Sequence, residues 1–487
     1  MLTGTLLRRA GIECPAECKD IEITDIVTRA DMATKGSMFI CIKGNNTDGH
    51  DYIGEAVNNG AVVIVAEQVR DECVGGAAIV KVDNTRHVAA LLYNIQCDEP
   101  TKKLTVVGVT GTNGKTSVCA LLESIFLAEG VTCGVIGTTG CRICAEPLEG
   151  VSAGLTTPDA HELYSILALM AERGVTHVFL EVSSHALSLS RVDAIRFKYG
   201  IFTNLSRDHL DYHGNMEDYF LAKARLALIC EKLVVNIDDE YGARLAAAHP
   251  KALTCSKFEG AFTAKNVKSS ARGSEYKLLW SGGELDARVG ALGDFSVMNS
   301  LQAAAAALDM GISADAVKRG LLRFFGAKGR MERAVFSEPY EVIVDYAHTP
   351  DALERLLCSA RLLRADGGRI ILLFGCGGDR DKGKRKQMAQ IASRLSDEVI
   401  VTSDNSRSEK AEDIIADILK GIDKEKPYTV VASRARAIEY AVSIARAGDV
   451  VLLAGKGHEK YEIDADGKHD FDEISIVRAA VAAKNKA

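Results

Sequence analysis

Short runs of apolar residues alternate along the chain with polar, glycine-containing turns. In the first part of the chain, SMFICIKG (37–44) and AVVIVAEQ (61–68) have the composition of strands, and Gly, Asn or Asp residues bound each of them. The polar segment CDEPTKK (97–103) follows and contains a proline. We therefore expect a small N-terminal α/β domain over residues 1–100.

Residues 104–130 predict a strand, then a glycine-rich turn, then a helix; their sequence is LTVVGVTGTNGKTSVCALLESIFLAEG. VTCGVIGTTG and THVFLEVSS have the composition of further buried strands, and FSVMNSLQAAAAALDMG (295–311) that of an alanine-rich helix ended by Gly311. Alternating strand and helix signals predict a parallel sheet. We expect a central domain with a parallel or mixed sheet over residues 101–333.

The pattern restarts after GRMERA (329–334). Five apolar strands are predicted at YEVIVDYAHTP, RIILLFGCGGD, EVIVTSDNS, YTVVAS and DVVLLAGKGHE, and helical segments lie between most of them. This pattern is typical of an open, doubly wound, Rossmann-like sheet, whose ligands bind at the carboxyl ends of the strands. We expect such a domain over residues 334–487.

Composition narrows the class of protein. Hydrophobic residues make up 47% and charged residues 26% of the chain, which excludes a disordered or collagen-like protein. The net charge of −7 provides no electrostatic footprint for nucleic-acid binding. No apolar run approaches 18 residues, and the start of the chain lacks the features of a signal peptide, so we expect no membrane insertion.

Cysteine usage favours a reducing compartment. The chain has 13 cysteines, an odd number, which fits a cytoplasmic protein better than a secreted disulfide framework. Two close pairs, Cys14/Cys18 and Cys141/Cys144, lack the second pair or the histidines that a zinc site would need. We therefore expect a cytoplasmic protein without zinc.

The segment from Gly108 to Thr116 has the chemistry of a phosphate-binding loop. It follows an apolar strand and opens a helix, so backbone N–H groups and the helix N-terminus can face an anion. Lys115 can reach phosphate oxygens, and the Thr116 hydroxyl can bind Mg²⁺. The loop is a variant, since Val109 stands where the strict pattern has glycine. The alternative is a glycine-rich surface turn. The predicted nucleotide contacts are Thr110, Gly111, Thr112, Asn113, Gly114, Lys115, Thr116 and Ser117.

The loop sequence TGTNGKT resembles that of the Mur ligase family, whose members use ATP to join an amino acid to a nucleotide-linked muramyl peptide. Further segments resemble the family's motifs in order, over about residues 37–463: TTPD (156–159), EVSSH (181–185), NLSRDHLDYH (204–213), GRME (329–332), DYAH (345–348), DNSR (404–407) and GKGHE (455–459). The similarity is greatest to the type that adds meso-diaminopimelate. The resemblance implies a three-domain α/β fold with a P-loop ATPase-like centre.

The resemblance also implies the reaction and its components. The substrates would be UDP-MurNAc-L-Ala-D-Glu and meso-diaminopimelate, the cofactors ATP and Mg²⁺, and the intermediate an acyl phosphate in peptidoglycan precursor synthesis. Such chemistry needs charge neutralisation and positioning more than a protein nucleophile. We expect a monomer with hinges near residues 100 and 333.

Four residues are predicted to be catalytic: Lys115, Glu181, His209 and Lys223. Thr116 and Glu181, which ends the strand HVFLE, can hold one Mg²⁺. By resemblance, His209 binds a second Mg²⁺, and Lys223 is carbamylated by CO₂ and contributes to the metal site. That modification requires a neutral amine and hence a lowered pKa. Judged singly, Glu181 would be a surface glutamate, His209 a core or capping histidine and Lys223 a solvent-facing lysine.

The resemblance assigns three further groups of contacts. The nucleotide would also meet Asn299, Arg330 and Asp345. The UDP-linked substrate would meet Thr28, His50, Thr156, Thr157, Ser183 and Arg191. The amino acid would meet Arg380, Asp404, Asn405, Arg407, Gly455 and Glu459. The chain departs from the family's usual residues at Ser296, Lys328, Leu189 and Ser406, and over 29–31 in the first domain.

The amino-acid pocket distinguishes the substrates. Arg407 can form a two-pronged bond to the second carboxylate of diaminopimelate, and Asp404 and Glu459 can receive its ammonium. L-lysine lacks that carboxylate and would not need Arg407. An L-lysine-adding enzyme is the alternative within the family.

Other classes remain as alternatives. The DNSR and GKGHE segments argue against a D-alanyl-D-alanine-adding ligase and a folylpolyglutamate synthase-like enzyme. A P-loop GTPase switch would need an NKxD-type loop, which is not found. A non-catalytic nucleotide-binding paralogue is favoured only by the altered first domain, while the predicted catalytic residues argue against it.

Overall fold

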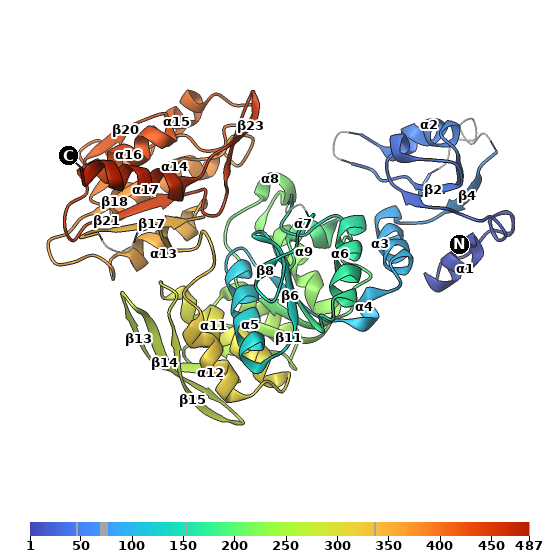
Figure 1. Cartoon of the computed structure of the whole chain (residues 1–487), viewed down its shortest axis with the longest axis horizontal. Coiled ribbons are helices and arrows are strands. Elements are labelled where there is room, and N and C mark those ends of the chain that lie inside the picture. The colour runs from blue at the N-terminus through green and yellow to red at the C-terminus, as the bar shows by residue number, and fades with distance from the viewer. Residues whose placement is uncertain (45–46, 69–75, 152–153, 336–337, 487) are drawn as a thin grey trace. The chain divides into compact units, whose positions relative to one another are not determined.

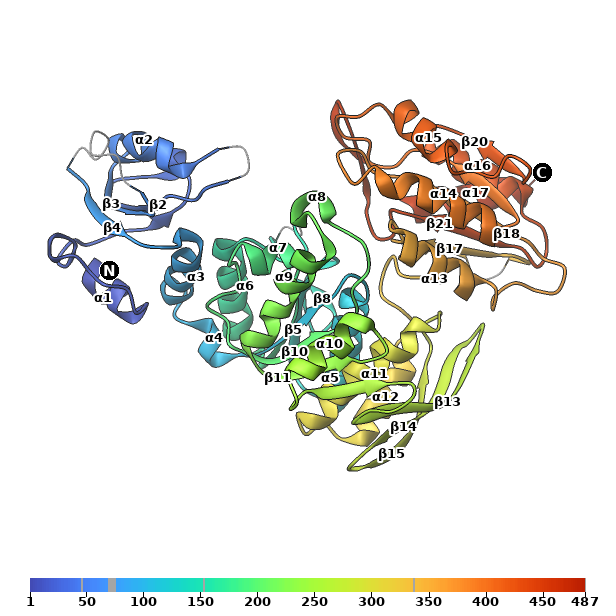
Figure 2. The same cartoon turned by 180° about the vertical axis from the view of Figure 1, so that it is seen from behind.

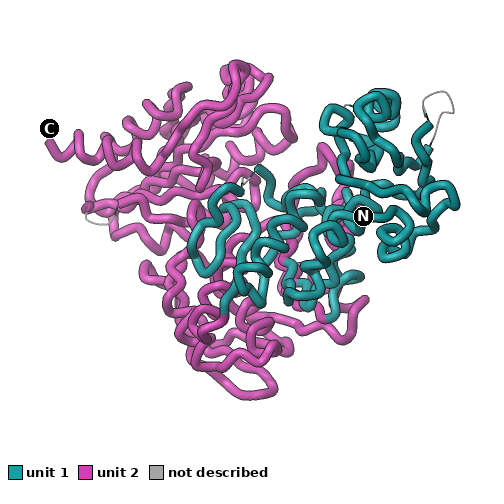
Figure 3. The backbone as a smooth tube through the Cα atoms, turned by 45° about the vertical axis from the view of Figure 1, so that its right-hand side comes forward, with its two compact units in different colours: residues 1–108, 132–200, 225–231 teal, residues 109–131, 201–224, 232–487 magenta. Residues whose placement is uncertain are grey.

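The structure is a computed structural model, and it describes residues 1–44, 47–68, 76–151, 154–335 and 338–486. The chain divides into two compact units (Figure 3). The first unit comprises residues 1–108, 132–200 and 225–231, and the second comprises residues 109–131, 201–224 and 232–487. Cys73 lies outside the described residues, and the other 12 cysteines are free thiols.

The N-terminal part of the first unit is a parallel four-stranded sheet in the order β1-β2-β3-β4. Alternate residues of β2 point to opposite faces, so Phe39 packs with Ile53 of α2, and Met38 packs in the cluster that contains Leu92 of α3. The predicted strands at 37–44 and 61–68 are therefore confirmed as β2 and β3. The elements are α1 (Thr3–Arg9), η1 (Ala16–Cys18), β1 (Ile26–Val27), η2 (Ala30–Met32), β2 (Ser37–Ile40), η3 (Gly49–Tyr52), α2 (Ile53–Asn58), β3 (Ala61–Ala66), β4 (Ala78–Lys81), α3 (Thr85–Gln96) and α4 (Pro100–Lys103).

A second sheet of 11 strands has the order β15-β14-β13-β12-β11-β10-β5-β9-β6-β7-β8. In the first unit β9 pairs with β6 in parallel, while β7 and β8 continue antiparallel. The elements are β5 (Thr105–Thr110), β6 (Cys133–Gly137), β7 (Gly140–Ile143), β8 (Glu146–Pro147), α6 (Ala160–Glu172), β9 (His177–Glu181), α7 (Ser184–Ser188) and β10 (Phe197–Phe202).

In the second unit, the alanine-rich helix α11 is almost wholly buried. Its residues 296–307 are all buried, because small side chains let α5 and β13 approach it closely. Figure 1 shows α5, α11 and α12 beside the antiparallel strands β13, β14 and β15. The elements are α5 (Lys115–Glu129), α8 (Leu210–His213), α9 (Met216–Leu228), β11 (Cys230–Asn236), α10 (Glu240–Ala248), β12 (Leu253–Ser256), β13 (Phe262–Ser270), β14 (Gly273–Trp280), β15 (Gly283–Val289), α11 (Phe295–Asp309) and α12 (Ala314–Arg323).

The C-terminal part of the second unit is a six-stranded sheet in the order β16-β17-β21-β18-β19-β20. Strands β17 to β21 are the five predicted strands, and all pairs among them are parallel. The elements are β16 (Glu332–Arg333), β17 (Glu341–Asp345), α13 (Pro350–Ala360), β18 (Ile370–Phe374), α14 (Gly383–Leu395), β19 (Glu398–Val401), α15 (Ala411–Leu419), β20 (Tyr428–Val430), α16 (Arg434–Ile444), β21 (Val450–Ala454), β22 (Tyr461–Asp464), β23 (Gly467–Asp470) and α17 (Glu473–Lys484).

Helices cover both faces of this C-terminal sheet (Figure 2). Leu372 and Leu452 pack with α13, α14 and α15, whereas their neighbours Leu373 and Leu453 pack with α16 and α17. The doubly wound arrangement expected from the sequence is therefore confirmed, and so is the α/β class with parallel and mixed sheets. Within the described ranges, no helix is long and apolar enough to cross a membrane.

Candidate active site

The phosphate loop of the second unit joins β5 to α5, and glycines shape it. Gly111 has φ +144°, and a Cβ there would collide with the Thr203 hydroxyl. Gly114 has φ +91°, and a Cβ there would lie 2.6 Å from Asn299 Oδ1. Only glycine fits both positions, because each combines a backbone conformation that L-residues rarely adopt with a close neighbour. The loop therefore exposes backbone N–H groups at the start of α5.

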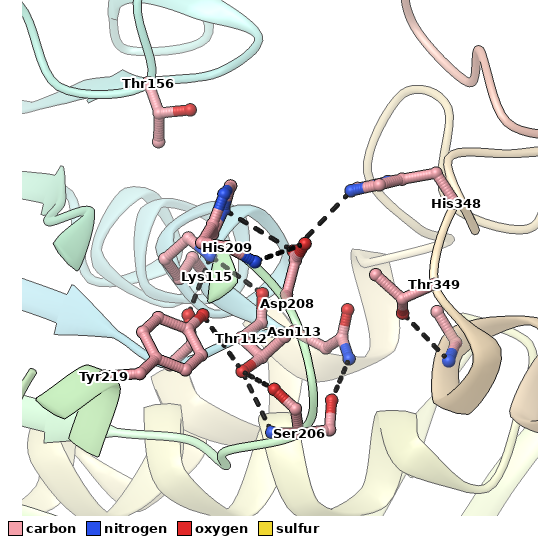
Figure 4. A network of polar contacts seen from close by, with 12 residues as sticks. Thr112, Asn113, Lys115, Thr156, Ser206, Asp208, His209, Tyr219, His348 and Thr349 are labelled. Atoms are coloured by element: carbon pink, nitrogen blue, oxygen red, sulfur yellow. Dashed lines mark hydrogen bonds and ion pairs between the residues drawn. The ribbon is translucent and has the colours of Figure 1, made fainter. Parts of the chain in front are cut away.

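The segment that follows β10 holds the loop in place. The Asn113 N–H donates to Asn204 Oδ1 at 3.0 Å, and the Asn113 carbonyl accepts from Thr203 Oγ1 at 2.6 Å. Thr112 Oγ1 donates to the Ser206 carbonyl at 3.2 Å and accepts from the Ser206 N–H at 3.0 Å. Figure 4 shows Thr112, Asn113 and Ser206 within this network. The loop is thus preorganised by the predicted NLSRDHLDYH segment.

Two lysines approach the loop. Lys115 Nζ donates to the carbonyls of Gly111 and Thr112 at 2.8 and 2.9 Å. Lys223, on α9, is only 1% exposed, and its Nζ donates to the same Gly111 carbonyl at 2.9 Å. Burial, and next the charge of Lys115, lower the pKa of Lys223 well below its ordinary value. The single-residue expectation of a solvent-facing lysine is therefore wrong at Lys223.

A buried aspartate gathers two histidines beside the loop. Asp208 Oδ2 lies 3.5 Å from His209 Nε2 and 3.7 Å from His348 Nε2 (Figure 4). Burial alone would raise the pKa of Asp208, but His348, His209 and Lys384 hold it well below its ordinary value. His209 has φ +52° and precedes α8 directly, so its backbone is held in an unusual conformation.

A cavity of about 350 Å³ opens next to the loop, which is large enough for part of a nucleotide. It is lined by residues that include Asn204, Asp239, Phe295, Asn299 and Arg355. A smaller cavity shares several of these side chains and is lined by the predicted nucleotide residues Asn113, Gly114, Thr116, Ser117, Asn299, Arg330 and Asp345. The structure therefore brings the predicted nucleotide contacts from three separate segments together.

Asp345 and Arg330 are fixed on the wall of the smaller cavity. The two carboxylate oxygens of Asp345 accept from the N–H groups of Met331 and Ala347, each at 2.7 Å. Burial raises the pKa of Asp345 above its ordinary value, although Arg330 partly opposes this. The Arg330 guanidinium lies over the Tyr346 ring, 4.7 Å from its centre.

In the first unit, Glu181 is 1% exposed at the end of β9. Its two carboxylate oxygens accept from the Thr138 N–H and the Thr138 hydroxyl, each at 3.0 Å. A Cβ at Gly137 would collide with Glu181 Oε1, so glycine is required there. Glu181 is thus a buried and oriented carboxylate, and the expectation of a surface glutamate is wrong.

Hydroxyl groups and one arginine surround Glu181 in the first unit. Thr138 Oγ1 also lies 3.1 Å from Thr156 Oγ1, and Thr157 Oγ1 donates to the Glu181 carbonyl at 2.7 Å. The Ser183 N–H donates to Thr157 Oγ1 at 3.0 Å, and Arg191 Nη1 donates to the Thr157 carbonyl at 2.9 Å. Four of the predicted substrate residues therefore belong to one network.

A cavity of about 490 Å³ in the first unit connects these residues to the N-terminal sheet. Thr28 and Arg191 both line it, but His50 is not among its lining residues. Both ring nitrogens of His50 are occupied, by the Asp48 carboxylate at 2.6 Å and the Glu67 N–H at 3.1 Å. Thr28 therefore lies where a substrate could reach it, while His50 stabilises the loop around it.

The lining residues of this cavity that were not predicted include Arg86, Tyr93 and His161. Arg86 and Tyr93 lie seven residues apart on α3, so they share a helix face, and the Tyr93 and His161 rings meet edge to face at 5.1 Å. The helical periodicity of α3 could have indicated that Arg86 and Tyr93 lie on one face of the helix. His161 comes from α6, and no local signal connects it to them.

The C-terminal sheet gathers the predicted amino-acid residues at the carboxyl ends of β18, β19 and β21. Asp404 and Asn405 are buried after β19, and Glu459 follows β21. Asn405 Nδ2 donates to Glu459 Oε2 at 2.8 Å. Gly455 has φ +121°, and a Cβ there would lie 2.5 Å from Asp404 Oδ2. A dense acidic cluster results.

The two predicted arginines of this region, Arg407 and Arg380, donate to backbone carbonyls rather than to these carboxylates. Arg407 Nη1 donates to the carbonyls of Gly378 and Asn405 at 2.8 and 3.2 Å. Arg380 Nη1 donates to the Asp379 carbonyl at 2.9 Å. Across the described part of the chain, neither Arg407 nor Arg380 forms an ion pair with a carboxylate. Their charges are therefore available to an anionic ligand.

The predicted metal ligands are distributed over the two units. Thr116, His209 and Lys223 belong to the second unit, and Glu181 to the first. Within the described residues, no group of three or more His, Cys, Asp and Glu side chains could hold a metal ion by itself.

Fold and site together define an α/β nucleotide-binding protein with a phosphate loop and a cluster of charged side chains at the carboxyl edge of its last sheet. The chain matches three family descriptions: the Mur ligase family catalytic domain over residues 22–106, the Mur ligase middle domain over residues 109–307, and the Mur ligase glutamate ligase domain over residues 329–457. The chain belongs to the Mur ligase family.

Individual relatives support the same assignment. The UDP-N-acetylmuramoyl-L-alanyl-D-glutamate–2,6-diaminopimelate ligase 1 of Clostridium acetobutylicum is 39% identical over 94% of each chain. The corresponding ligase of Gloeobacter violaceus is 40% identical over 98% of each chain. A solved structure of a ligase with this name has a TM-score of 0.70 and 32% identity, and covers 99% of both chains.

Proposed function

We propose that this protein is an ATP-dependent, ADP-forming ligase that joins meso-diaminopimelate to UDP-MurNAc-L-Ala-D-Glu in peptidoglycan precursor synthesis. Curated relatives of nearly the same length carry this activity in their names. The observation that carries the proposal for this chain is the amino-acid pocket. There the Arg407 guanidinium has no ion-pair partner among the described residues, while the Asp404 and Glu459 carboxylates lie in the same loop cluster.

The first step activates the substrate carboxylate. A carboxylate oxygen of the D-Glu side chain attacks the γ-phosphorus of ATP, the bond from that phosphorus to the β,γ-bridging oxygen breaks, and ADP leaves. Backbone N–H groups between Gly111 and Thr116 bind the phosphates, and Lys115 and Arg330 offset the charge that develops. Asn299 and Asp345, in the adjoining cavity, orient the nucleoside.

The second step forms the amide. The neutral amine of diaminopimelate attacks the acyl carbon, and the bond from that carbon to the phosphate oxygen breaks. Inorganic phosphate leaves, and the amine loses a proton to solvent. The protein's part is to hold the two reacting atoms together, so no protein nucleophile is needed. Arg407 and Arg380 bind the distant carboxylate of diaminopimelate, and Asp404 and Glu459 bind its distant ammonium.

The residues present fit a magnesium site. Thr116, Glu181, His209 and a carbamylated Lys223 would hold Mg²⁺, which when bound neutralises the charge of the β- and γ-phosphates. The support is the environment of Lys223. Burial and the neighbouring Lys115 lower its pKa and so favour the neutral amine, the form that attacks CO₂ to give a carbamate and one proton. Glu181 is already oriented by Thr138.

The UDP-linked substrate occupies the 490 Å³ cavity of the first unit in this proposal. Thr28 and Arg191 line the cavity, and Thr156, Thr157 and Ser183 extend the polar wall from it. Arg86 adds a cation that suits a diphosphate. His50 contributes by ordering the neighbouring loop.

The chain would work as three domains, over residues 1–100, 101–333 and 334–487, with hinges near the two joints. The breaks between the three family matches, after residue 106 and between residues 307 and 329, lie near the two proposed joints. We propose a cytoplasmic monomer, which agrees with the free thiols of the described cysteines and with the location of ATP and of nucleotide-linked precursors.

Phosphate release tests the proposal directly. The purified protein is incubated with ATP, Mg²⁺ and UDP-MurNAc-L-Ala-D-Glu, together with meso-diaminopimelate, L-lysine, D-Ala-D-Ala or no acceptor. We expect turnover only with meso-diaminopimelate, and a product whose mass contains it. Turnover with L-lysine instead would retain the ligase and overturn the amino-acid assignment. The absence of turnover with every acceptor, in protein that binds ATP, would favour a non-catalytic paralogue.

A further inference from the structure

Lys456 is a fully buried lysine in the amino-acid pocket that the proposed reaction does not use. It is 0% exposed, in the second position of the GKGHE segment after β21. Its Nζ donates to Asn405 Oδ1 and to the Tyr461 carbonyl, each at 2.8 Å. Burying an ammonium group is unfavourable unless its charge is compensated, so its surroundings require an explanation.

The hydrogen bonds of Lys456 determine the orientation of a side-chain amide. Asn405 Oδ1 accepts from two groups that can only donate, Lys456 Nζ and the Ile463 N–H at 3.0 Å. The amide nitrogen must therefore point the other way, where it donates to Glu459 Oε2 at 2.8 Å. Lys456 thus positions Glu459 through Asn405 in addition to facing it directly.

Lys456 also lies between two carboxylates. Its Nζ is 4.0 Å from Asp404 Oδ1 and 3.9 Å from Glu459 Oε2. Burial, and next the Asp404 carboxylate, raise the pKa of Glu459, and Lys456 opposes that rise. Burial alone would raise the pKa of Asp404, but Arg434 and Lys456 hold it below its ordinary value. Lys456 therefore helps to keep both carboxylates ionised.

A second buried cation in the pocket has a partner of its own. Arg434 Nε lies 2.7 Å from Glu473 Oε1, and both side chains are almost fully buried. Its other nitrogens donate to the carbonyls of Ser403 and Ala454 at 3.1 and 2.9 Å. Arg434 thus offsets Glu473 and also acts on the Asp404 carboxylate, and Lys456 is the cation that lies between Asp404 and Glu459.

Four carboxylates, those of Asp404, Glu459, Glu462 and Glu473, face two buried cations, Arg434 and Lys456. Carboxylates are therefore in excess in this part of the pocket, and Arg407 supplies one positive charge close by. A carbon centre that bears one ammonium and one carboxylate has the complementary charges. We propose that Lys456 is a positioning residue of this pocket, which orients Asn405 and matches the pocket to a zwitterionic acceptor end rather than to a lone ammonium. The inference rests on the proposed function.

Substitution of Lys456 by a side chain of similar length without charge tests this role. In Lys456→Met we expect the KM for meso-diaminopimelate to rise about tenfold, while the KM values for ATP and UDP-MurNAc-L-Ala-D-Glu stay within about twofold. Lys484→Met is the matched control, because Lys484 also donates to a buried carbonyl, that of Val442, but outside the pocket. A KM for diaminopimelate that stays within twofold, or an equal rise of all three KM values, would overturn the proposal.

The inhibition constant of L-lysine shows whether Lys456 acts through its charge or whether its substitution damages the whole pocket. Loss of Lys456 makes the pocket more negative, so the inhibition constant of L-lysine should stay the same or fall while diaminopimelate binds more weakly. A rise of both constants by the same factor would contradict charge matching. Lys456→Gln retains a donor for Asn405 but no charge, and we expect an intermediate KM; if Lys456→Met does not fold, Lys456→Gln decides.

The activity of the parent enzyme shows whether a negative result counts against this inference or against the proposed function. A parent without turnover on any acceptor would reject the proposed function, and the inference with it. A parent that uses diaminopimelate, together with a folded variant of unchanged KM, would reject the inference alone.

Discussion

Two buried lysines of the second unit show how neighbouring charges change the pKa of the same type of side chain. Lys223, beside the phosphate loop, and Lys456, in the amino-acid pocket, are 1% and 0% exposed. Burial lowers the pKa of both, but the next largest influence on Lys223 is the cation Lys115, which lowers its pKa further, whereas for Lys456 it is the carboxylate of Asp404, which raises it. The first environment favours a neutral, nucleophilic amine, whereas in the second the neighbouring carboxylates oppose the loss of the proton.

The largest effect is expected from removal of Lys223, the lysine beside the phosphate loop. Lys223→Ala should lower kcat by about 1,000-fold or more, because the carbamate oxygens of the proposed metal site would be lost. The measurement is steady-state phosphate release, with Lys198→Ala as a control because Lys198 forms a half-exposed pair with Glu231. The parent, but not the variant, should also gain activity when bicarbonate is returned to CO₂-free buffer. Full activity of Lys223→Ala would exclude a carbamate role.

Arg407 tests the cationic half of the amino-acid pocket. Arg407→Ala should raise the KM for meso-diaminopimelate by about 100-fold, since a charge-assisted two-pronged bond is lost. ATP binding should not change, because Arg407 does not line either nucleotide cavity described above. Calorimetric titration with ATP and kinetics in diaminopimelate provide the two readouts, and an unchanged KM for diaminopimelate would remove Arg407 from the pocket.

A smaller effect is expected at Gly455, which directly precedes Lys456 and whose added Cβ would lie 3.8 Å from Arg434 Nη2. In Gly455→Ala the added Cβ would press against Asp404 Oδ2 in a backbone conformation of φ +121°. We expect a loss of about 2 kcal/mol in stability and a KM for diaminopimelate several-fold higher. Gly467→Ala, which also has a positive φ but no atom within 4 Å of the added Cβ, is the control for backbone strain alone. Equal effects of both substitutions would show that crowding of Asp404 is unimportant.

The smallest effect concerns a third buried base, His458. Burial, and next Arg330, lower the pKa of His458 from 6.5 to about 4. The unfolded chain therefore binds more protons than the folded one between these pH values, so stability falls as pH drops from about 6.5 to about 4 and changes little above that window. His458→Gln should reduce the loss of stability between pH 7 and pH 5 by about 1–2 kcal/mol. Urea denaturation at the two pH values measures it, and identical losses for parent and variant would contradict the buried neutral state.

Local patterns in the sequence were sufficient for much of the fold. The strand–glycine–helix succession at the phosphate loop and the five apolar strands of the last sheet depend on neighbours within a few residues, and both are present as predicted. The motif comparison also placed the acidic and basic residues of DNSR and GKGHE at one sheet edge, because the carboxyl ends of parallel strands coincide there.

Local sequence patterns could not predict which side chains are buried or which distant residues they contact. Lys223 has no local feature that marks it as buried, since its partner Gly111 lies 112 residues away. Arg86 and His161 likewise meet in one cavity from separate helices, and the occupied ring of His50 depends on Glu67.

The sequence by itself determined the class of fold, the phosphate loop, the family and the residue types of each pocket, because these follow from short-range periodicity and from motif identity. Only the tertiary structure decided which charges are buried, which amide orientation Asn405 adopts and why Lys223 and Lys456 differ. The physical reason is that the energy of a charge depends on desolvation and on neighbouring charges, which the fold gathers from distant segments of the chain.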